Sequence, residues 1–217
     1  VIATDIREGG GCQILDVMDA EGVLSLVNSE SITEIYHLAA LLSATGERNP
    51  ELCWKINVGG LENVISAAKA NGCRVFAPSS IAVFGPDCPS IAPQVTPLNP
   101  TTVYGKTKVV SEQLAMTAGV DIRGLRYPGL VSFKAPAGGG TTDYAVEIFH
   151  AALADRHYAC FVREDTRLPM MYMDDAIRAT LELMAAPAEM LGGARGGYNI
   201  AGCSFTVGEL VESIQRH

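Results

Sequence analysis

The chain has 217 residues, of which 48% are hydrophobic and 18% are charged, and its formal net charge is −8. This apolar fraction supports a folded core and excludes a disordered acidic linker, because disordered segments bury too little apolar surface. The acidic balance without a basic cluster predicts no nucleic-acid partner, since phosphate binding needs concentrated Lys and Arg. No apolar run reaches the ~18–20 residues that span a bilayer, so no membrane partner is predicted either.

The first residues predict that the sequence is part of a longer protein. Residues 1–5 have the pattern of the end of a buried strand, and neither an initiator Met nor a signal peptide precedes them. The six cysteines are scattered without a Cys-x-x-Cys pair. This spacing predicts free thiols in a reducing compartment and no metal site.

Short apolar runs alternate with amphipathic ones over the first 130 residues. Strands are predicted at residues 14–17, 32–40, 74–78 and 122–127, and helices at 61–70 and 101–118. Thr101 or Thr102 caps the second helix, directly after Pro100. Strands that alternate with helices in this way predict βαβ crossovers and a parallel α/β sheet.

After residue 130 the pattern changes, beginning with a glycine-rich loop at residues 138–140. Helices are predicted at 142–153 and 174–185, and a strand is predicted near 158–162. Thr206 and Glu209 have the spacing of a capping box and open a last helix. We therefore expect a nucleotide-binding domain at residues 1–130. A smaller, mainly substrate-binding lobe at 131–217 would return some elements to the sheet.

Tyr104 and Lys108 are the first candidates for chemistry. They lie four residues apart on the second helix and so share one face. A neighbouring cation favours the phenolate, so Lys108 is predicted to lower the pKa of Tyr104 and make it a usable base. Taken alone, this spacing is common on solvated helices. Ser79 and Ser80 follow the strand at 74–78, at the carboxyl end where parallel sheets bind ligands.

With these residues in place, the chain resembles the extended short-chain dehydrogenase/reductase superfamily, in its sugar epimerase/dehydratase branch. Residues 36–40 (Tyr-His-Leu-Ala-Ala) and 57–60 (Asn-Val-Gly-Gly) are similar to two of its motifs. The resemblance implies a Rossmann-like, doubly wound sheet and NAD as cofactor. Asp5 would bind the adenosine ribose, and Asp16 and Val17 would flank the adenine. The cofactor-binding residues implied by the resemblance are Asp5, Asp16, Val17, Leu38, Ala39, Ala40, Asn57, Ser79, Tyr104, Lys108, Tyr127 and Leu130.

Three downstream segments resemble the short-chain type L-threonine 3-dehydrogenase family more narrowly: residues 126–130, 138–145 and 168–172. This resemblance implies NAD-dependent oxidation of L-threonine to 2-amino-3-ketobutyrate without a metal. Tyr104 would be the base, Lys108 would hold the nicotinamide ribose, and Ser80 would orient the substrate oxygen. The substrate-binding candidates are Ser43, Ser80, Thr141 and Thr142. The backbone amides at the start of the helix at 142–153 would suit the substrate carboxylate.

The family's glycine-rich pyrophosphate loop and the strand before it are missing from the sequence, and ~30 further residues are expected upstream. Two other functions therefore stay open. A nucleotide-sugar epimerase or dehydratase would need cations for the diphosphate, of which Lys134, Arg163 and Arg167 are the main candidates. A non-catalytic dinucleotide-binding regulator is the other.

The resemblance also implies a homodimer, packed through the helix that bears Tyr104, with which Val109, Leu114 and Ala115 are compatible. The expected location is intracellular. It would be the mitochondrial matrix in a eukaryote and the cytoplasm in a bacterium.

Overall fold

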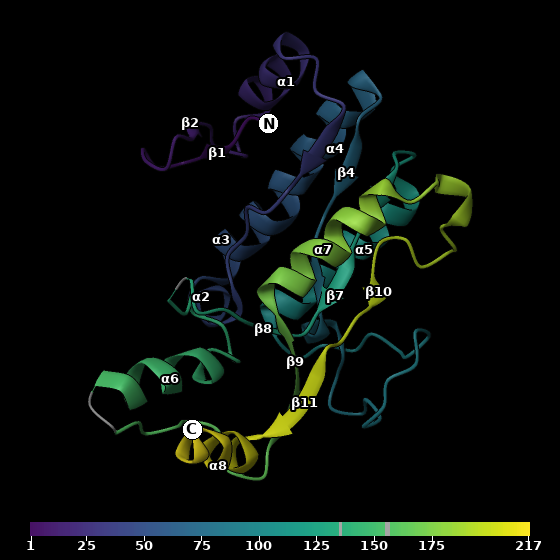
Figure 1. Ribbon diagram of the computed structural model, residues 1–217. Coiled ribbons are helices and arrows are strands. Elements are labelled where there is room, and N and C mark those ends of the chain that lie inside the picture. Colours follow the sequence, from purple (N-terminus) through teal and green to yellow (C-terminus); the bar gives the residue numbers. More distant parts are fainter. Residues whose placement is uncertain (135, 155–156) are drawn as a thin grey trace.

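The computed structural model describes residues 1–134, 136–154 and 157–217. Parallel strands form the middle layer of the larger part of the molecule, and helices cover both faces (Figure 1). The strands are β1 (Thr4–Asp5), β2 (Gln13–Ile14), β3 (Glu34–Tyr36), β4 (Arg74–Phe76), β5 (Ser79–Ser80), β6 (Ile122–Arg123), β7 (Leu125–Tyr127), β8 (Gly129–Val131), β9 (Arg167–Tyr172), β10 (Tyr198–Asn199) and β11 (Cys203–Thr206).

The helices differ in length and type. The α-helices are α1 (Ala20–Ser29), α2 (Ser43–Arg48), α3 (Pro50–Trp54), α4 (Gly60–Asn71), α5 (Val103–Thr117), α6 (Tyr144–Ala154), α7 (Met173–Ala185) and α8 (Val207–Arg216). A π-helical turn at Lys55–Gly59 joins α3 to α4, and 3₁₀ turns occur at Ile81–Val83 and Ala188–Met190.

The strands form two three-stranded parallel sheets, with the orders β3-β4-β6 and β10-β7-β5. The second sheet continues the first, with β5 after β4 and β7 after β6. The chain passes directly from β4 towards β5, and from β6 through Gly124 into β7. A Cβ atom at Gly124 would lie only 2.4 Å from the carbonyl oxygen of Gly196 and 2.6 Å from that of Ala77. Only glycine therefore allows the neighbouring backbones to approach this closely. The two sheets confirm the prediction of a parallel α/β sheet.

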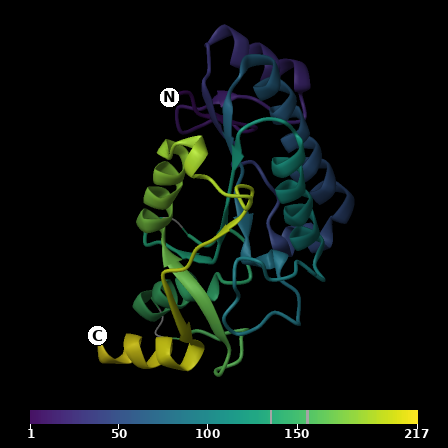
Figure 2. The same cartoon turned by 90° about the vertical axis from the view of Figure 1, so that its right-hand side faces the viewer.

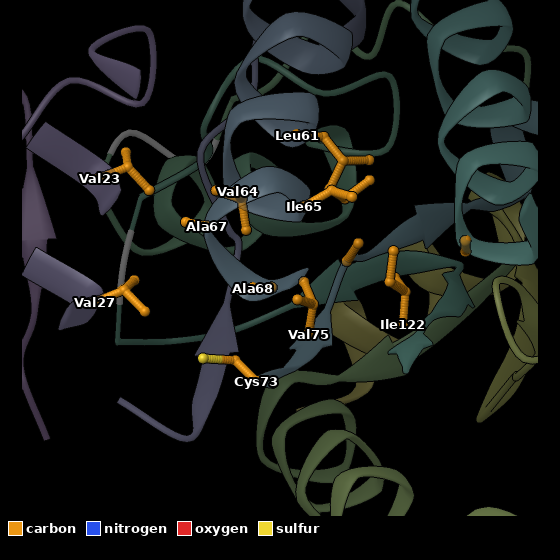
Figure 3. Close-up of a cluster of buried hydrophobic side chains, with 12 residues drawn as sticks. Val23, Val27, Leu61, Val64, Ile65, Ala67, Ala68, Cys73, Val75 and Ile122 are labelled. Atoms are coloured by element: carbon orange, nitrogen blue, oxygen red, sulfur yellow. The ribbon is translucent and has the colours of Figure 1, made fainter. Parts of the chain in front are cut away.

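The main hydrophobic core lies between α1, α4 and the β4 and β6 strands (Figure 3). Leu61, Val64, Ile65 and Ala68 form the buried stripe of α4, at the helical spacing that the sequence predicts. They pack with Val75 on β4 and with Ile122 on β6. Figure 2 shows α4 and α5 on one side of the strands and α7 on the other.

The second lobe is built from β8, β9, β11, α6 and α8. β8 and β9 run parallel, whereas β9 and β11 form an antiparallel pair that the sequence pattern did not predict. Tyr144, Ile148, Met170 and Leu210 are buried together in its core. Thr206 and Glu209 form the predicted capping box at the start of α8.

Four local strand predictions are wrong. Residues 1–5 were expected to end a buried strand, but β1 is exposed, because β2 is its only partner among the described strands. The strands predicted at 14–17 and 32–40 are shorter, since β2 ends at Ile14 and β3 ends at Tyr36. Described residues 157–162 form no strand. Tyr158, Cys160 and Val162 alternate onto the lobe core, and this packing explains the misleading pattern.

All six cysteines are free thiols. Within residues 1–134, 136–154 and 157–217, no helix is long and apolar enough to cross a membrane. The same residues contain no cluster of three or more His, Cys, Asp or Glu side chains able to hold a metal ion.

Candidate active site

The candidate residues gather beyond the carboxyl ends of the parallel strands, where open α/β sheets bind ligands. Ser79 and Ser80 form β5 just after β4, residues 37–40 follow β3, and Tyr127 ends β7. Helix α5 brings Tyr104 and Lys108 to the same edge, because it packs against β5. The fold therefore brings together residues that the sequence separates by up to ninety positions.

The start of α5 is fixed against β5 by close backbone packing. Thr102 caps the helix, and its hydroxyl accepts a 3.1 Å hydrogen bond from the amide of Gly105. A Cβ atom at Gly105 would lie 2.2 Å from the carbonyl oxygen of Ala82, so only glycine allows this approach. Ser80 caps the adjoining 3₁₀ turn by accepting a 3.2 Å bond from the Ala82 amide. Tyr104 and Ser80 are thereby held next to each other.

The electrostatics of Tyr104 differ from the prediction. Burial raises the pKa of Tyr104 to about 12, although its hydrogen bond with the Ser80 side chain acts in the opposite direction. The Lys108 ammonium lies 5.5 Å from the centre of the Tyr104 ring and donates a 2.7 Å bond to the Pro78 carbonyl. Burial lowers the pKa of Lys108 to about 8. The pKa of the phenol is thus raised and not lowered as predicted, because desolvation of the phenolate is the largest effect on it.

Helix α2 packs against the first turn of α5. Glu47 accepts a 2.6 Å hydrogen bond from the Val103 amide, which places a carboxylate at the positive end of α5. A Cβ atom at Gly46 would lie 3.8 Å from the Cβ of Tyr104. Ser43, a predicted substrate residue, is the first residue of this same helix. Sequence reasoning missed Glu47, because the amide that it caps is 56 positions away.

The glycine-rich segment approaches α2 and β8. A Cβ atom at Gly138 would lie 3.5 Å from the Leu42 side chain, and one at Gly129 would lie 2.8 Å from the Cβ of Thr142. The Asp143 carboxylate accepts hydrogen bonds from the amides of Gly139 (2.6 Å) and Gly140 (2.7 Å). Thr142 is therefore placed on β8, and the segment around Ser43 lies next to Gly138.

The amides at the start of α6 are less available than the sequence predicts. The Ala145 amide donates to Thr142, and those of Val146 and Glu147 donate to the Asp143 carbonyl. These three amides are engaged within the turn, and a carboxylate site at the start of the helix stays a prediction. Thr141 is exposed and Thr142 is half-buried, and both keep their places as substrate candidates.

The cofactor candidates near the amino terminus lie at strand ends. Asp5 ends β1 and accepts a 2.9 Å bond from the Arg7 amide, while Asp16 accepts one of the same length from Met18. The Val17 side chain lies against Gly60, where an added Cβ would approach it to 2.8 Å. Beyond β3, Leu38 is 68% exposed. Ala39 is exposed and Ala40 half-buried.

Asn57 is buried in the π-helical turn and connects three segments. Its side chain accepts a 2.7 Å bond from the Leu41 amide and donates to the Leu41 carbonyl at 3.0 Å. It also donates to Thr107 on α5 at 3.2 Å. Asn57 thus holds the segment after β3 against the helix of Tyr104. π-helical turns often occur at functional sites.

Two candidates on the other side of the site have different environments. The hydroxyl of Tyr127 is hydrogen-bonded to Thr180 of α7, so this side chain is engaged in packing. Leu130 is half-buried in the middle of β8.

His37 is interior, as expected. Burial, and to a smaller extent the charge of Lys108, lowers its pKa to about 4. His37 is therefore neutral at neutral pH, and its low pKa makes it a weak proton acceptor.

Comparison with known proteins gives a consistent assignment. The model of the NAD dependent epimerase/dehydratase family matches residues 4–201. The chain belongs to this family. A relative called an uncharacterized epimerase/dehydratase, from Staphylococcus aureus, is 45% identical over all of this chain and 71% of its own length. The chain is thus an enzyme of an NAD-dependent oxidoreductase family, and its cofactor is NAD.

Solved structures of L-threonine dehydrogenases are similar to this chain. A monomeric L-threonine 3-dehydrogenase from a metagenome database is 49% identical, with a TM-score of 0.95 over 100% of this chain and 73% of that one. The GalE-like enzyme of Cupriavidus necator is 48% identical, with a TM-score of 0.93 over 99% and 73%. The Clostridium difficile enzyme is 41% identical, with a TM-score of 0.94 over 99% and 71%.

The described residues of this family member fit NAD. Two carboxylates stand at or just beyond the ends of β1 and β2, and exposed apolar side chains follow β3. The buried ammonium of Lys108 lies at the same edge of the sheet. The carboxylates suit the hydroxyls of the adenosine ribose, and the apolar side chains suit the adenine base. The ammonium suits the second ribose, next to the nicotinamide ring.

Proposed function

We propose that this family member oxidises the β-hydroxyl of L-threonine to 2-amino-3-ketobutyrate. The observation that carries the proposal is the cluster of Ser80, Tyr104 and Lys108 at the carboxyl edge of the sheet. Support also comes from neighbours of 41–49% identity, which are L-threonine dehydrogenases.

In the proposed reaction, Tyr104 as phenolate accepts the proton of the substrate hydroxyl. The Cβ–H bond breaks at the same carbon, its electron pair leaves as hydride, and a carbonyl forms. Bound oxidised NAD supplies the hydride acceptor. Ser80 donates to the substrate oxygen and orients it towards the neighbouring Tyr104. Lys108 supplies the compensating charge for the phenolate.

The proposed binding roles follow the strand ends. Asp5, Asp16 and Val17 would hold the adenosine half, and Lys108 would hold the ribose of the nicotinamide. The half-buried residues Ser43 and Thr142, with exposed Thr141, would bind threonine. The remaining cofactor positions are Leu38, Ala39, Ala40, Asn57, Ser79, Tyr127 and Leu130. We also propose the boundary at residue 130 between the cofactor domain and the lobe.

A nucleotide-sugar epimerase or dehydratase is the second candidate, because the curated relatives carry that general name. The charges of the second lobe weigh against it. Each cation that could hold a diphosphate already faces a carboxylate: Lys134 pairs with Asp174 at 3.2 Å, Arg163 with Asp165 at 2.8 Å, and Arg167 with Glu209 at 2.6 Å. These exposed pairs are individually weak, but their carboxylates cancel the local positive potential.

The test measures NADH formation by the full-length protein with NAD and L-threonine. Wild type is compared with Tyr104→Phe, and Tyr198→Phe on β10 is the matched control, because it removes a phenol away from the cluster. We expect turnover in wild type and in the control, and a ~10²–10⁴-fold loss in Tyr104→Phe.

Other outcomes of this test would identify the alternatives. Interconversion of uridine diphosphate sugars without release of NADH would replace the threonine proposal by the epimerase. NAD binding without turnover of either substrate class would point to a regulator. A homodimer stays a prediction to be checked by light scattering, because Ala115 is buried in this chain's own core and Leu114 packs on it.

A further inference from the structure

Helix α5 contacts three successive residues of the catalytic strand segment through one face. Tyr104, Lys108 and Glu112 are spaced four residues apart, so they follow one another along this face. The phenol of Tyr104 lies beside the Ser80 side chain, and Lys108 donates to the carbonyl of Pro78. Between them, Ser79 donates a 2.5 Å bond to the Glu112 carboxylate. Side chains of α5 therefore contact each of residues 78, 79 and 80.

Glu112 is itself held by a buried arginine. The Arg126 guanidinium donates to both carboxylate oxygens of Glu112, at 2.9 and 2.8 Å. The side chains are 7% and 10% exposed, respectively. Ser79 and Arg126 are direct neighbours in the β5–β7 register, so the carboxylate bridges two paired strands. Such a planar two-bond contact fixes direction as well as distance.

The remaining nitrogen of Arg126 and the planar face of its guanidinium also have contacts. Its free nitrogen donates to Asn199 of β10 at 3.0 Å and to the carbonyl of Gln94 at 3.2 Å. Its guanidinium lies 5.3 Å from the centre of the Phe84 ring. On the other side of Glu112, a Cβ atom at Gly197 would lie 2.3 Å from a carboxylate oxygen. The carboxylate is thus contacted by Ser79, by Arg126 and by the backbone at Gly197.

We propose that Glu112 is a positioning residue, which places Ser80 against Tyr104 by holding Ser79 while Arg126 fixes its carboxylate. Stability alone is a poor reason for this pair, because buried ion pairs can often be replaced by apolar residues without loss. Placement is a better reason, since a misplacement of ~1 Å near reacting groups can cost ~10²-fold in rate. The role rests on the proposed function of Ser80 and Tyr104.

The experiment compares Ser79→Ala, Glu112→Gln and the double variant in the full-length protein. Glu112→Gln keeps the size of the side chain and an oxygen for Ser79, so it is the variant expected to fold. We expect kcat for threonine oxidation to fall ~10–100-fold in each single variant. In Glu112→Gln, the KM values for NAD and threonine should stay within about two-fold, because Glu112 is not among the proposed binding residues. The double variant should lose no more than the worse single one, because both act through one contact.

A remote variant separates positioning from loss of stability. Val27→Ala opens a cavity in the core beside α1, far from the site, and should lower Tm while kcat is kept. Unchanged kcat in Ser79→Ala and Glu112→Gln would overturn the proposal. Additive losses in the double variant, or an equal loss of kcat in Val27→Ala at an equal fall in Tm, would do the same.

A structural readout keeps this test independent of the substrate. If wild type does not oxidise threonine, the proposed function fails, but the placement can still be measured. Crystal structures of wild type and Glu112→Gln should show the hydroxyls of Ser80 and Tyr104 moved apart by ~0.5 Å or more, the tolerance of a productive site. An unchanged separation would overturn the positioning role by itself.

Discussion

Two buried arginines in the same row of strands hold the helices on opposite faces of the sheet. Arg123 on β6 donates to the carbonyls of Leu183, Met184 and Ala186 at the end of α7. Arg126 on β7 turns to the other face and holds Glu112 of α5. The two are three residues apart, and the pleat of a strand sends odd and even positions to opposite sides.

The difference between the two faces lies in what each arginine holds. Arg123 satisfies backbone carbonyls at the negative end of α7, and Asp121 balances its charge at 2.6 Å. No residue of the catalytic cluster takes part in that network. Arg126 holds a carboxylate that also binds Ser79, next to Ser80. We therefore expect the buried cation on the α7 face to serve stability and those on the α5 face to serve placement and chemistry.

The largest effect is expected from the third buried cation, Lys108 on the α5 face. Lys108→Met should lower kcat/KM ~10²–10⁴-fold, because the phenolate of Tyr104 loses its compensating charge. Thermal stability should not fall, since burial of an ammonium is itself costly. NADH formation and thermal unfolding measured on the same sample check both parts. A variant of wild-type activity would contradict the role of Lys108.

The pH dependence sharpens this prediction. With the pKa of Lys108 lowered to about 8 and that of Tyr104 raised to about 12, the pair loses its first proton near pH 8. The pair that has lost one proton includes the active form, phenolate beside ammonium, in a fixed proportion, so kcat/KM of wild type should rise with pH and level off above about 8. Lys108→Met leaves only the phenol to titrate, so its profile should still rise at the highest pH measurable. Superimposable profiles would refute this assignment, because titration of threonine itself is common to both enzymes.

Arg123→Met should separate stability from activity. It removes the donor for three carbonyls of α7 and leaves Asp121 without its partner, so the free energy of unfolding should fall by ~3–5 kcal/mol. At temperatures where the variant is folded, kcat should be that of wild type. Denaturant unfolding and NADH assays measure the two quantities. A variant that loses kcat but keeps its stability would reverse the comparison.

The Asp121 carboxyl gives Arg123→Met a pH signature. Hydrogen bonds from Arg123 hold the pKa of Asp121 below its usual value. This group therefore contributes stability above the unfolded pKa of ~3.9, and the contribution is lost as pH falls through the folded value. The stability difference between wild type and Arg123→Met should shrink accordingly in acid.

A smaller effect is expected at the helix caps. Thr102→Ala removes the cap of α5 and Thr206→Ala that of α8, so each should cost ~1 kcal/mol of stability. Only Thr102→Ala should also lower kcat, because the first turn of α5 carries Tyr104. Equal kcat in the two variants would show that the cap does not affect the site.

The smallest effect is expected on the outer surface of α7. Arg178 and Glu182 face each other at 4.0 Å with both side chains exposed. Glu182→Gln should change the free energy of unfolding by no more than ~0.5 kcal/mol and leave kcat unchanged. Thermal unfolding measures this change in stability. A loss comparable with that of Arg123→Met would mean that exposure does not separate the two kinds of charge pair.

Local patterns were enough to predict much of the framework. The apolar stripe of α4, the Thr102 cap and the capping box of α8 depend on residues within a few positions of one another, so they can be read along the chain. The placement of Tyr104, Lys108 and Ser80 also followed, because carboxyl ends of parallel strands share one edge. Glu112 could have been found as the next residue at the same spacing on that helix face.

What only the tertiary structure decided depends on partners that are distant in the chain. The Ser79–Glu112 bond spans 33 positions, and the cap that Glu47 provides for α5 spans 56. The antiparallel β9–β11 pair joins segments on either side of α7. Residues 157–162 pack on the core of the second lobe but do not pair with a strand. The order of the Tyr104 and Lys108 pKa values was likewise decided by the fold. Charge spacing along a helix is encoded locally, whereas desolvation depends on everything that packs around it.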